Sequence, residues 1–444
     1  MDSALRETLA ARALEFSAAD ETEAIVTGET SALTRFTHNA IHQNVAHSDT
    51  TVRLRAIVGG RTGVAVTNDT SEAGLRAVTE RATEIARLAP RNEAFAGLAK
   101  YAPPAAPPAG SFHAETASAG PELRAEIARE IFRSGEADGL WAAGYVTTGN
   151  SGVTIANSAG TLASYDSTYC GLNVKQNAAD SSGYAEAYSS DIAVLDGAFA
   201  GARAAEKARA SRAPVAVDPG EWTVILEPAA FGELLSYLLP NFSAQAFDEG
   251  SSFLAEGLGR AYAGENVTLA DDFAEPLSPG QPFDYEGAPK HRVVLLDRGI
   301  ARDIVTDATW ARKLGRSNSG HALPEPNAAG PRVLNGVLDG GSRSTAELIA
   351  NTKRGLLVTR FWYIRNVDYR KTIVTGMTRD GTFLIEEGKI AGGVRNLRFN
   401  QSILEALCRA EFSRERVRTG GYSYSLVIPT AKIEGFRFTS VTAF

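Results

Sequence analysis

Runs in which β-branched residues alternate with polar ones recur along the chain, and they restrict it to folds rich in β-sheet. Successive side chains of a strand point to opposite faces, so this alternation predicts strands with one buried face. The first runs lie at 22–30, 32–46 and 50–69, and the pair Gly59 and Gly60 predicts a hairpin turn. Later runs are WTVILE, HRVVLLDRG, RGLLVTRFWY, KTIVTGMTRDGTFLIEEGKI and SYSLVIPTAKIEGF.

Helical periodicity occurs at 1–16, 71–90, 121–132 and 191–211. These stretches follow no strand–helix–strand rhythm, which favours the α+β class. The length of 444 residues and a polar segment at 213–222 predict two domains. We expect an N-terminal α+β domain at 1–215 and a strand-rich C-terminal domain at 216–444.

The predicted N-terminal domain contains a hairpin followed by a helix twice. The stretches GGRTGVAVTNDTSEAGLRAV and DSSGYAEAYSSDIAVLDGAF show this order, and a Pro-rich connector at 101–110 lies between them. This pattern suggests an internal duplication.

Composition argues against several classes of protein. The formal net charge of -7 gives no basic footprint for nucleic acid or an anionic membrane. Cys170 and Cys408 belong to no CxxC pair, so neither a disulfide framework nor a structural zinc motif is indicated. The chain has no run of about 18 apolar residues, which a membrane span needs, and 1–16 lacks the pattern of a secretory leader. We therefore expect a cytoplasmic protein.

The usual motifs of catalysis and nucleotide binding are absent. None of the six histidines is followed by Glu, so the sequence contains no HE dipeptide of a compact zinc-hydrolase helix. There is also no GxSxG, GxGxxG or GxxxxGK[ST] motif. One segment mixes Arg with aromatic residues: TRFWYIRNVDYRK, at 359–371. As an alternating strand it more often lines a cleft or a subunit interface than it binds nucleic acid.

The stretch FGELLSYLLP, at 231–240, predicts a short helix with one apolar face. Phe231, Leu234, Leu235 and Leu238 fall within one arc at 100° per residue, whereas Glu233 lies on the opposite side. Pro228 suits the first turn and Pro240 ends the run. A lone Glu on a polar helix face usually contacts solvent, so a catalytic role for Glu233 is the less common alternative.

Several blocks, in this order and spacing, resemble the TldD/PmbA family. In the second half they are SSFLAEGLGR, PFDYEGAPKHRVVLLDRGI, ARKLGRSNSGHA, GTFLIEEGKIAGGVRNLRFNQSILEAL and LVIPTAKIEGF. In the first half, FTHNAIHQNVAHSDTTVRLRAIVGGRTGVA resembles the N-terminal domain of that family. The likeness therefore spans nearly the whole chain.

This resemblance implies a subunit without a metal site. In the family, TldD-type subunits bind zinc through an HExxxH helix and a late Cys and cleave peptides, whereas TldE (PmbA) subunits lack the site and pair with TldD. Counted from the shared blocks, Gly232 and Tyr237 take the places of the two histidines, and Ser423 takes that of the cysteine. Only Glu233 remains, so the resemblance implies that this chain binds no cofactor and that zinc belongs to the partner.

We therefore expect a TldE-like, non-catalytic subunit that shapes the peptide cleft of a TldD-like zinc peptidase. Candidate residues for the cleft or the interface are Arg360, Tyr363, Arg365, Tyr369 and His321. One alternative is a metal-free enzyme in which Glu233 and Tyr237 act as acid and base. Another is a stand-alone homodimeric peptide-binding protein.

Three expectations follow from this interpretation. The purified chain should bind no stoichiometric zinc and cleave no peptide alone. Replacing Glu233 by Ala should change stability by no more than about 0.5 kcal/mol, because the residue is expected to be exposed. The chain should dimerise through an interface above about 1,600 Å², because strands such as GLLVTRFWYI carry apolar side chains on both faces.

Overall fold

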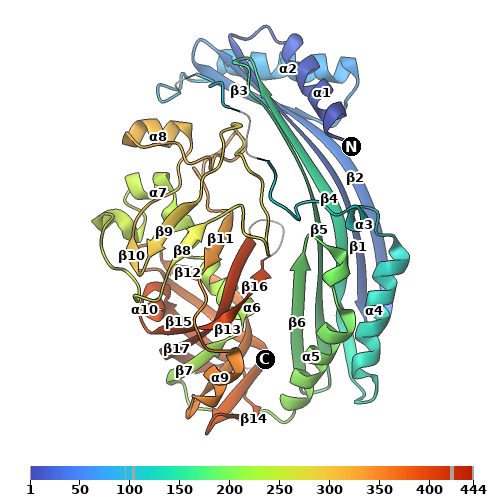
Figure 1. Cartoon of the computed structure of the whole chain (residues 1–444), viewed down its shortest axis with the longest axis vertical. Coiled ribbons are helices and arrows are strands. Elements are labelled where there is room, and N and C mark those ends of the chain that lie inside the picture. The colour runs from blue at the N-terminus through green and yellow to red at the C-terminus, as the bar shows by residue number, and fades with distance from the viewer. Residues whose placement is uncertain (1, 96, 103–105, 421–424, 443–444) are drawn as a thin grey trace.

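The computed structural model contains a long, curved sheet from the first half of the chain and a second sheet from the second half, which lie side by side (Figure 1). It describes residues 2–95, 97–102, 106–420 and 425–442. Helices and strands are interspersed along the chain, which confirms the predicted α+β class. No helix in this described part is long and apolar enough to cross a membrane.

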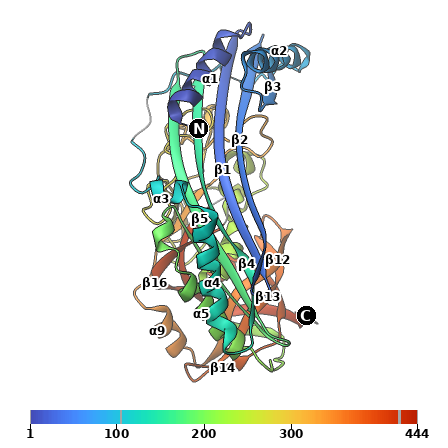
Figure 2. The ribbon, with the colours of Figure 1, turned by 90° about the vertical axis from the view of Figure 1, so that its right-hand side faces the viewer.

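The first half forms one six-stranded antiparallel sheet in the order β3-β2-β1-β4-β5-β6. Its elements are α1 (Ser3–Glu15), β1 (Glu21–Thr37), β2 (Ala40–Val58), β3 (Arg61–Thr67) and α2 (Glu72–Leu88), then α3 (Ala114–Ala117), α4 (Pro121–Glu136), β4 (Trp141–Asn157), β5 (Leu162–Asn177), β6 (Ser182–Ser189) and α5 (Gly197–Ala210). Strands β1 and β4 pair at the centre. Helices α1, α4 and α5 cover the face turned away from the second half (Figure 2).

Glycines fix the turns and the close packing of this sheet. Gly59 and Gly60 form the predicted two-residue turn between β2 and β3, and both have positive φ angles, 57° and 73°. A Cβ atom on Gly63 of β3 would lie 2.2 Å from a backbone oxygen of α2, and one on Gly183 of β6 would lie 2.2 Å from a backbone oxygen of α5. Each outer strand thus has a helix packed directly on its backbone. A duplication of the two units stays a prediction.

The second half forms an eleven-stranded mixed sheet. Its elements are β7 (Gly220–Leu226), α6 (Pro228–Ser236), α7 (Ala244–Asp248), β8 (Leu269–Asp271), β9 (Val293–Asp297), β10 (Ile300–Ala301), α8 (Ala308–Leu314), β11 (Asn335–Leu338), α9 (Thr345–Ala350), β12 (Arg354–Asp368), β13 (Ile373–Glu386), β14 (Lys389–Gly393), β15 (Leu397–Ser402), α10 (Ile403–Leu407), β16 (Ala410–Thr419) and β17 (Ser425–Val441). Strand β7 pairs with both β12 and β17, so β17, β15, β13, β12 and β7 close into a ring.

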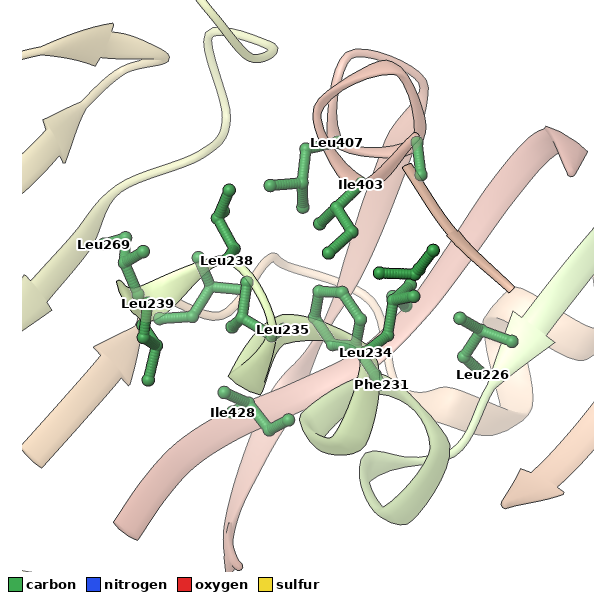
Figure 3. Close-up of a cluster of buried hydrophobic side chains, with 14 of the residues drawn as sticks. Leu226, Phe231, Leu234, Leu235, Leu238, Leu239, Leu269, Ile403, Leu407 and Ile428 are labelled. Atoms are coloured by element: carbon green, nitrogen blue, oxygen red, sulfur yellow. The ribbon is translucent and has the colours of Figure 1, made fainter. Parts of the chain in front are cut away.

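Helix α6 packs in the core of this second half. Phe231, Leu234 and Leu235 of its apolar stripe are completely buried, as predicted, and so is Leu238 just beyond its end. Figure 3 shows these side chains beside those of Ile403, Leu407 and Ile428. Pro228 occupies the first turn as expected, but the helix ends at Ser236, and a 3-10 turn at Leu239–Phe242 contains Pro240.

Strand β12 does not expose the apolar surface that the sequence led us to expect. Leu356, Leu357, Val358 and Phe361 are all buried, because β12 lies between β13 and β7 and both of its faces pack within the chain. Trp362, Tyr363 and Val367, in the second half of the strand, are exposed. The first half of β12 therefore gives no support to a dimer, and the dimer itself stays a prediction.

Candidate functional site

The polar face of α6 is turned toward strand β16 and the six-stranded sheet, and it carries the position expected for a first metal ligand. Gly232 is buried there. A Cβ atom on Gly232 would lie 2.5 Å from Cγ2 of Thr419 and 3.2 Å from Cδ1 of Ile428. A Cβ atom is not found at 2.5 Å from a carbon atom, so Thr419 fills the space that a longer side chain at this position would need.

The structure describes one of the other two expected metal-ligand positions, Tyr237. The Tyr237 hydroxyl donates a hydrogen bond of 2.7 Å to the backbone oxygen of Ile364, so it is held against β12. Ser423 lies outside the described residues. In the part of the chain that the structure describes, no three His, Cys, Asp or Glu side chains are grouped as a metal site requires.

Glu233 is half-buried, which corrects the expectation of an exposed side chain. Burial raises the pKa of its carboxyl to about 7, and the negative charge of Glu186 on β6 adds to the rise, whereas Arg360 opposes it. Within the described residues, no hydrogen bond reaches its side-chain oxygens; only its backbone oxygen accepts one, from Ser236. Glu233 is therefore a carboxyl group that exchanges its proton near neutral pH.

Glu186 and Arg360, which flank Glu233, are held by other partners. Glu186 accepts hydrogen bonds from Thr419, at 2.7 Å, and from the hydroxyl of Tyr184, at 2.6 Å. The Nε of Arg360 lies 3.2 Å from a carboxylate oxygen of Asp380, and its guanidinium stacks over the ring of Tyr184 at 4.5 Å. These contacts join the six-stranded sheet to the second half, and Arg360 thus lies where the sheets meet.

The remaining candidates of the Arg and aromatic segment lie elsewhere. Tyr363 is exposed and has a positive φ of 59° at an irregularity of β12. Arg365 stacks on its ring at 4.2 Å and donates to the backbone oxygen of Ile364. Tyr369 is exposed and borders a separate hollow of about 200 Å³. Arg365 and the hydroxyl of Tyr237 thus donate to the same backbone oxygen, that of Ile364.

His321 is completely buried rather than placed in an open cleft. Its Nε2 lies 3.2 Å from Oδ1 of Asp271, and its Nδ1 lies 3.0 Å from the backbone oxygen of Ser319. Burial by itself would raise the pKa of Asp271. His321 and the nearby Lys290 outweigh this effect and hold the pKa of Asp271 well below its usual range. His321 therefore belongs to a buried charge network that fixes the loop at 319–322.

A cavity of about 560 Å³ lies between the six-stranded sheet and the second half. This inter-sheet cavity is lined by Thr147, Tyr165, Ser167 and Tyr188 of the first half and by Phe283, Asp284, Lys290, Leu323, Leu334 and Arg418 of the second, among others. Its volume falls in the range of about 300–1,000 Å³ that is common for ligand pockets. The loop of His321 contributes Ala322 to its wall.

Sequence reasoning missed the residues that line this cavity. Arg418 is the last of three arginines on alternate positions, Arg414, Arg416 and Arg418, one residue before a Gly pair. That alternation was a usable signal, because it puts all three on one side of a strand. Tyr188, also in the lining, carried no such signal. Nor did Glu186, which flanks Glu233, because its bond is to Thr419, 233 positions later.

Models of one family match along most of the chain. They describe PmbA/TldA metallopeptidase domain 1 at residues 22–86, the central domain at 115–212 and the C-terminal domain at 219–440. A metalloprotease of Methanothermobacter thermautotrophicus is 28% identical over 198 residues, which are 42% of this chain and 41% of that protein. A metalloprotease TldD homolog of Haemophilus influenzae is 27% identical over 208 residues, 46% of this chain and 43% of that protein. The matches thus span less than half of these relatives.

Solved structures resemble the fold over nearly the whole length. TldE from Thermococcus kodakarensis superposes with a TM-score of 0.89 at 23% identity, covering 98% of this chain and 99% of that one. A proposed modulator of a DNA gyrase from Thermotoga maritima superposes with a TM-score of 0.87 at 18% identity, covering 98% and 100%. At these identities the likeness shows the fold alone.

Proposed function

The chain belongs to the PmbA/TldA metallopeptidase family, and we propose that it is a TldE-like subunit that binds no metal and completes the peptide cleft of a TldD-like zinc peptidase. The observation that carries the proposal is the filled space at Gly232. A side chain at this position would enter the volume of Thr419, 2.5 Å from the place of its Cβ atom. Tyr237, at the second histidine position, is bonded to β12.

A subunit without a metal site can still promote peptide cleavage. It can orient the peptide and exclude water, and both effects lower the barrier without a ligand from this chain. We place the complex in the cytoplasm, in agreement with two free cysteines, Cys170 and Cys408.

Metal analysis of the separate chains tests this proposal. Each chain is purified, dialysed against zinc and then against buffer, and its zinc content is measured. We expect one zinc per HExxxH homologue from the same source and none per copy of this chain. One zinc per copy of this chain would contradict the proposal.

A second candidate function is metal-free acid–base chemistry by Glu233. The pKa of about 7 favours it, because a carboxyl that titrates near neutral pH suits proton transfer. The bond of Tyr237 to Ile364 weighs against the pairing with Tyr237 that this function invoked. A reconstituted complex with Glu233→Gln separates the two candidates: retained peptide cleavage supports the partner role, and lost cleavage with normal assembly supports the enzyme.

A further inference from the structure

Arg418 differs from the other arginines of strand β16. Arg414 lies 3.2 Å from Glu415, and Arg416 lies 3.1 Å from Glu275. Arg418 forms no ion pair or hydrogen bond with a described residue, and its Nε is shielded from solvent. Burial lowers the pKa of Arg418, which reflects the cost of holding a charge in this place. A largely buried cation without a partner costs free energy, and a bound ligand of opposite charge would offset this cost.

The guanidinium of Arg418 belongs to the wall of the inter-sheet cavity. Burial lowers the pKa of the second cation of the wall, Lys290, but Asp271 and Asp284 favour its charge, and its Nζ donates a hydrogen bond of 3.3 Å to Oδ1 of Asn335. Much of the remaining lining is apolar or aromatic, including Tyr165, Phe283 and Leu334. The cavity thus combines a guanidinium that no described carboxylate contacts with walls that are in large part apolar or aromatic.

We propose that the inter-sheet cavity binds a ligand with one carboxylate and an apolar body, and that Arg418 holds the carboxylate. A guanidinium and a carboxylate form two parallel hydrogen bonds, which fixes the orientation of the ligand. The inference goes beyond the role as a partner subunit, because this site lies within the chain and needs neither a metal nor a second subunit.

The charges of the wall favour a carboxylate over a phosphate. Asp284 and Glu29 also border the cavity, and Glu29 accepts a hydrogen bond of 3.0 Å from Tyr169. A phosphate dianion bound to Arg418 would have a second negative charge, which Arg418 does not neutralise. That charge would be repelled by the carboxylates of Asp284 and Glu29. Two sources share the favoured chemistry: a free aryl or alkyl carboxylic acid and the C-terminal end of a peptide.

Calorimetric titration of the full chain tests the proposal with four probes: 3-phenylpropionate, N-acetylphenylalanine and the carboxamide of each. We expect at least one acid to bind about tenfold or more tightly than its amide, because a hydrogen bond to a charged group is lost with the carboxylate. Binding of N-acetylphenylalanine alone identifies the peptide terminus as the source, and binding of 3-phenylpropionate alone identifies a free acid. Equal binding of acid and amide, or no binding of either acid at about 10 mM, overturns the proposal.

Variants locate the site. We expect Arg418→Gln to weaken binding of the acid about tenfold or more, and Arg414→Gln on the same strand to leave it within about twofold. Arg418→Gln should keep its melting temperature, because it removes an unpaired charge and no bond. Binding to Arg418→Gln as tight as to the unmodified chain, or tighter binding of phenyl phosphate than of the carboxylates, contradicts the assignment.

Discussion

Replacing Glu233 by Gln is expected to stabilise the protein above neutral pH and to leave its stability nearly unchanged in acid. In the folded chain the pKa of Glu233 is raised from 4.5 to about 7, so the folded state binds the proton more tightly than the unfolded state. The contribution of Glu233 to the free energy of unfolding is therefore fully present below pH 4.5 and is lost as the pH rises through 7. Each unit by which the pKa rises corresponds to about 1.4 kcal/mol of unfolding free energy, so the rise from 4.5 to about 7 corresponds to on the order of 3 kcal/mol. Because the side chain is only half-buried, we expect about 1–2 kcal/mol at pH 8.

Urea unfolding at pH 5 and pH 8 measures this effect. The free energy of unfolding of Glu233→Gln is compared with that of the unmodified chain at each pH, so other buried carboxyls, such as Glu23 with its pKa raised to about 7 by burial, contribute equally to both. Glu80→Gln, on the exposed face of α2, is the matched control and should show no pH-dependent difference. Equal gains at both pH values, or no gain at pH 8, would refute the reasoning from burial.

Two further predictions concern packing and buried charge. Gly232→Ala should destabilise the fold by about 1–3 kcal/mol, because its Cβ atom would lie 2.5 Å from Cγ2 of Thr419; in a Thr419→Ser background, which removes that carbon, urea unfolding should show the cost largely relieved, and an unchanged cost would contradict the clash. Asp271→Asn should lower the free energy of unfolding at pH 7 by about 3–5 kcal/mol, because it removes the carboxylate that contacts His321 and favours the charge of the buried Lys290. The neighbouring Asp272→Asn, which breaks a pair at the surface, should cost less than about 1 kcal/mol, and equal costs for the two would count against the network.

The sequence predicted those parts of the fold that local pattern determines. The turn at Gly59 and Gly60 and the helix at Glu72–Leu88 follow from turn chemistry and periodicity within a short stretch. The apolar stripe of α6 was also predicted correctly, because helical spacing decides which side chains share a face. The end of α6 was not, since the 3-10 turn after it depends on packing in the core.

The site could be predicted only in part, because its environment comes from distant segments. Glu233 was expected to contact solvent, but distant segments bury part of it, and this burial raises its pKa, which Arg360 of β12 opposes and Glu186 of β6 favours. The apolar face of β12 was expected to be exposed, but the closed ring of strands buries it. The unpaired charge of Arg418 depends on which carboxylates reach it, and strand alternation alone does not reveal that.

The central claim is that this chain supports peptide cleavage by a second, metal-binding subunit. The most direct test is a titration of this chain into a fixed amount of an HExxxH homologue from the same source, with the rate of cleavage of an unfolded peptide as the readout. The account predicts no cleavage by this chain alone with or without zinc, and a rate that rises with added chain until the two are present in equal amounts. A rate that is independent of this chain, or cleavage by this chain alone, would contradict it.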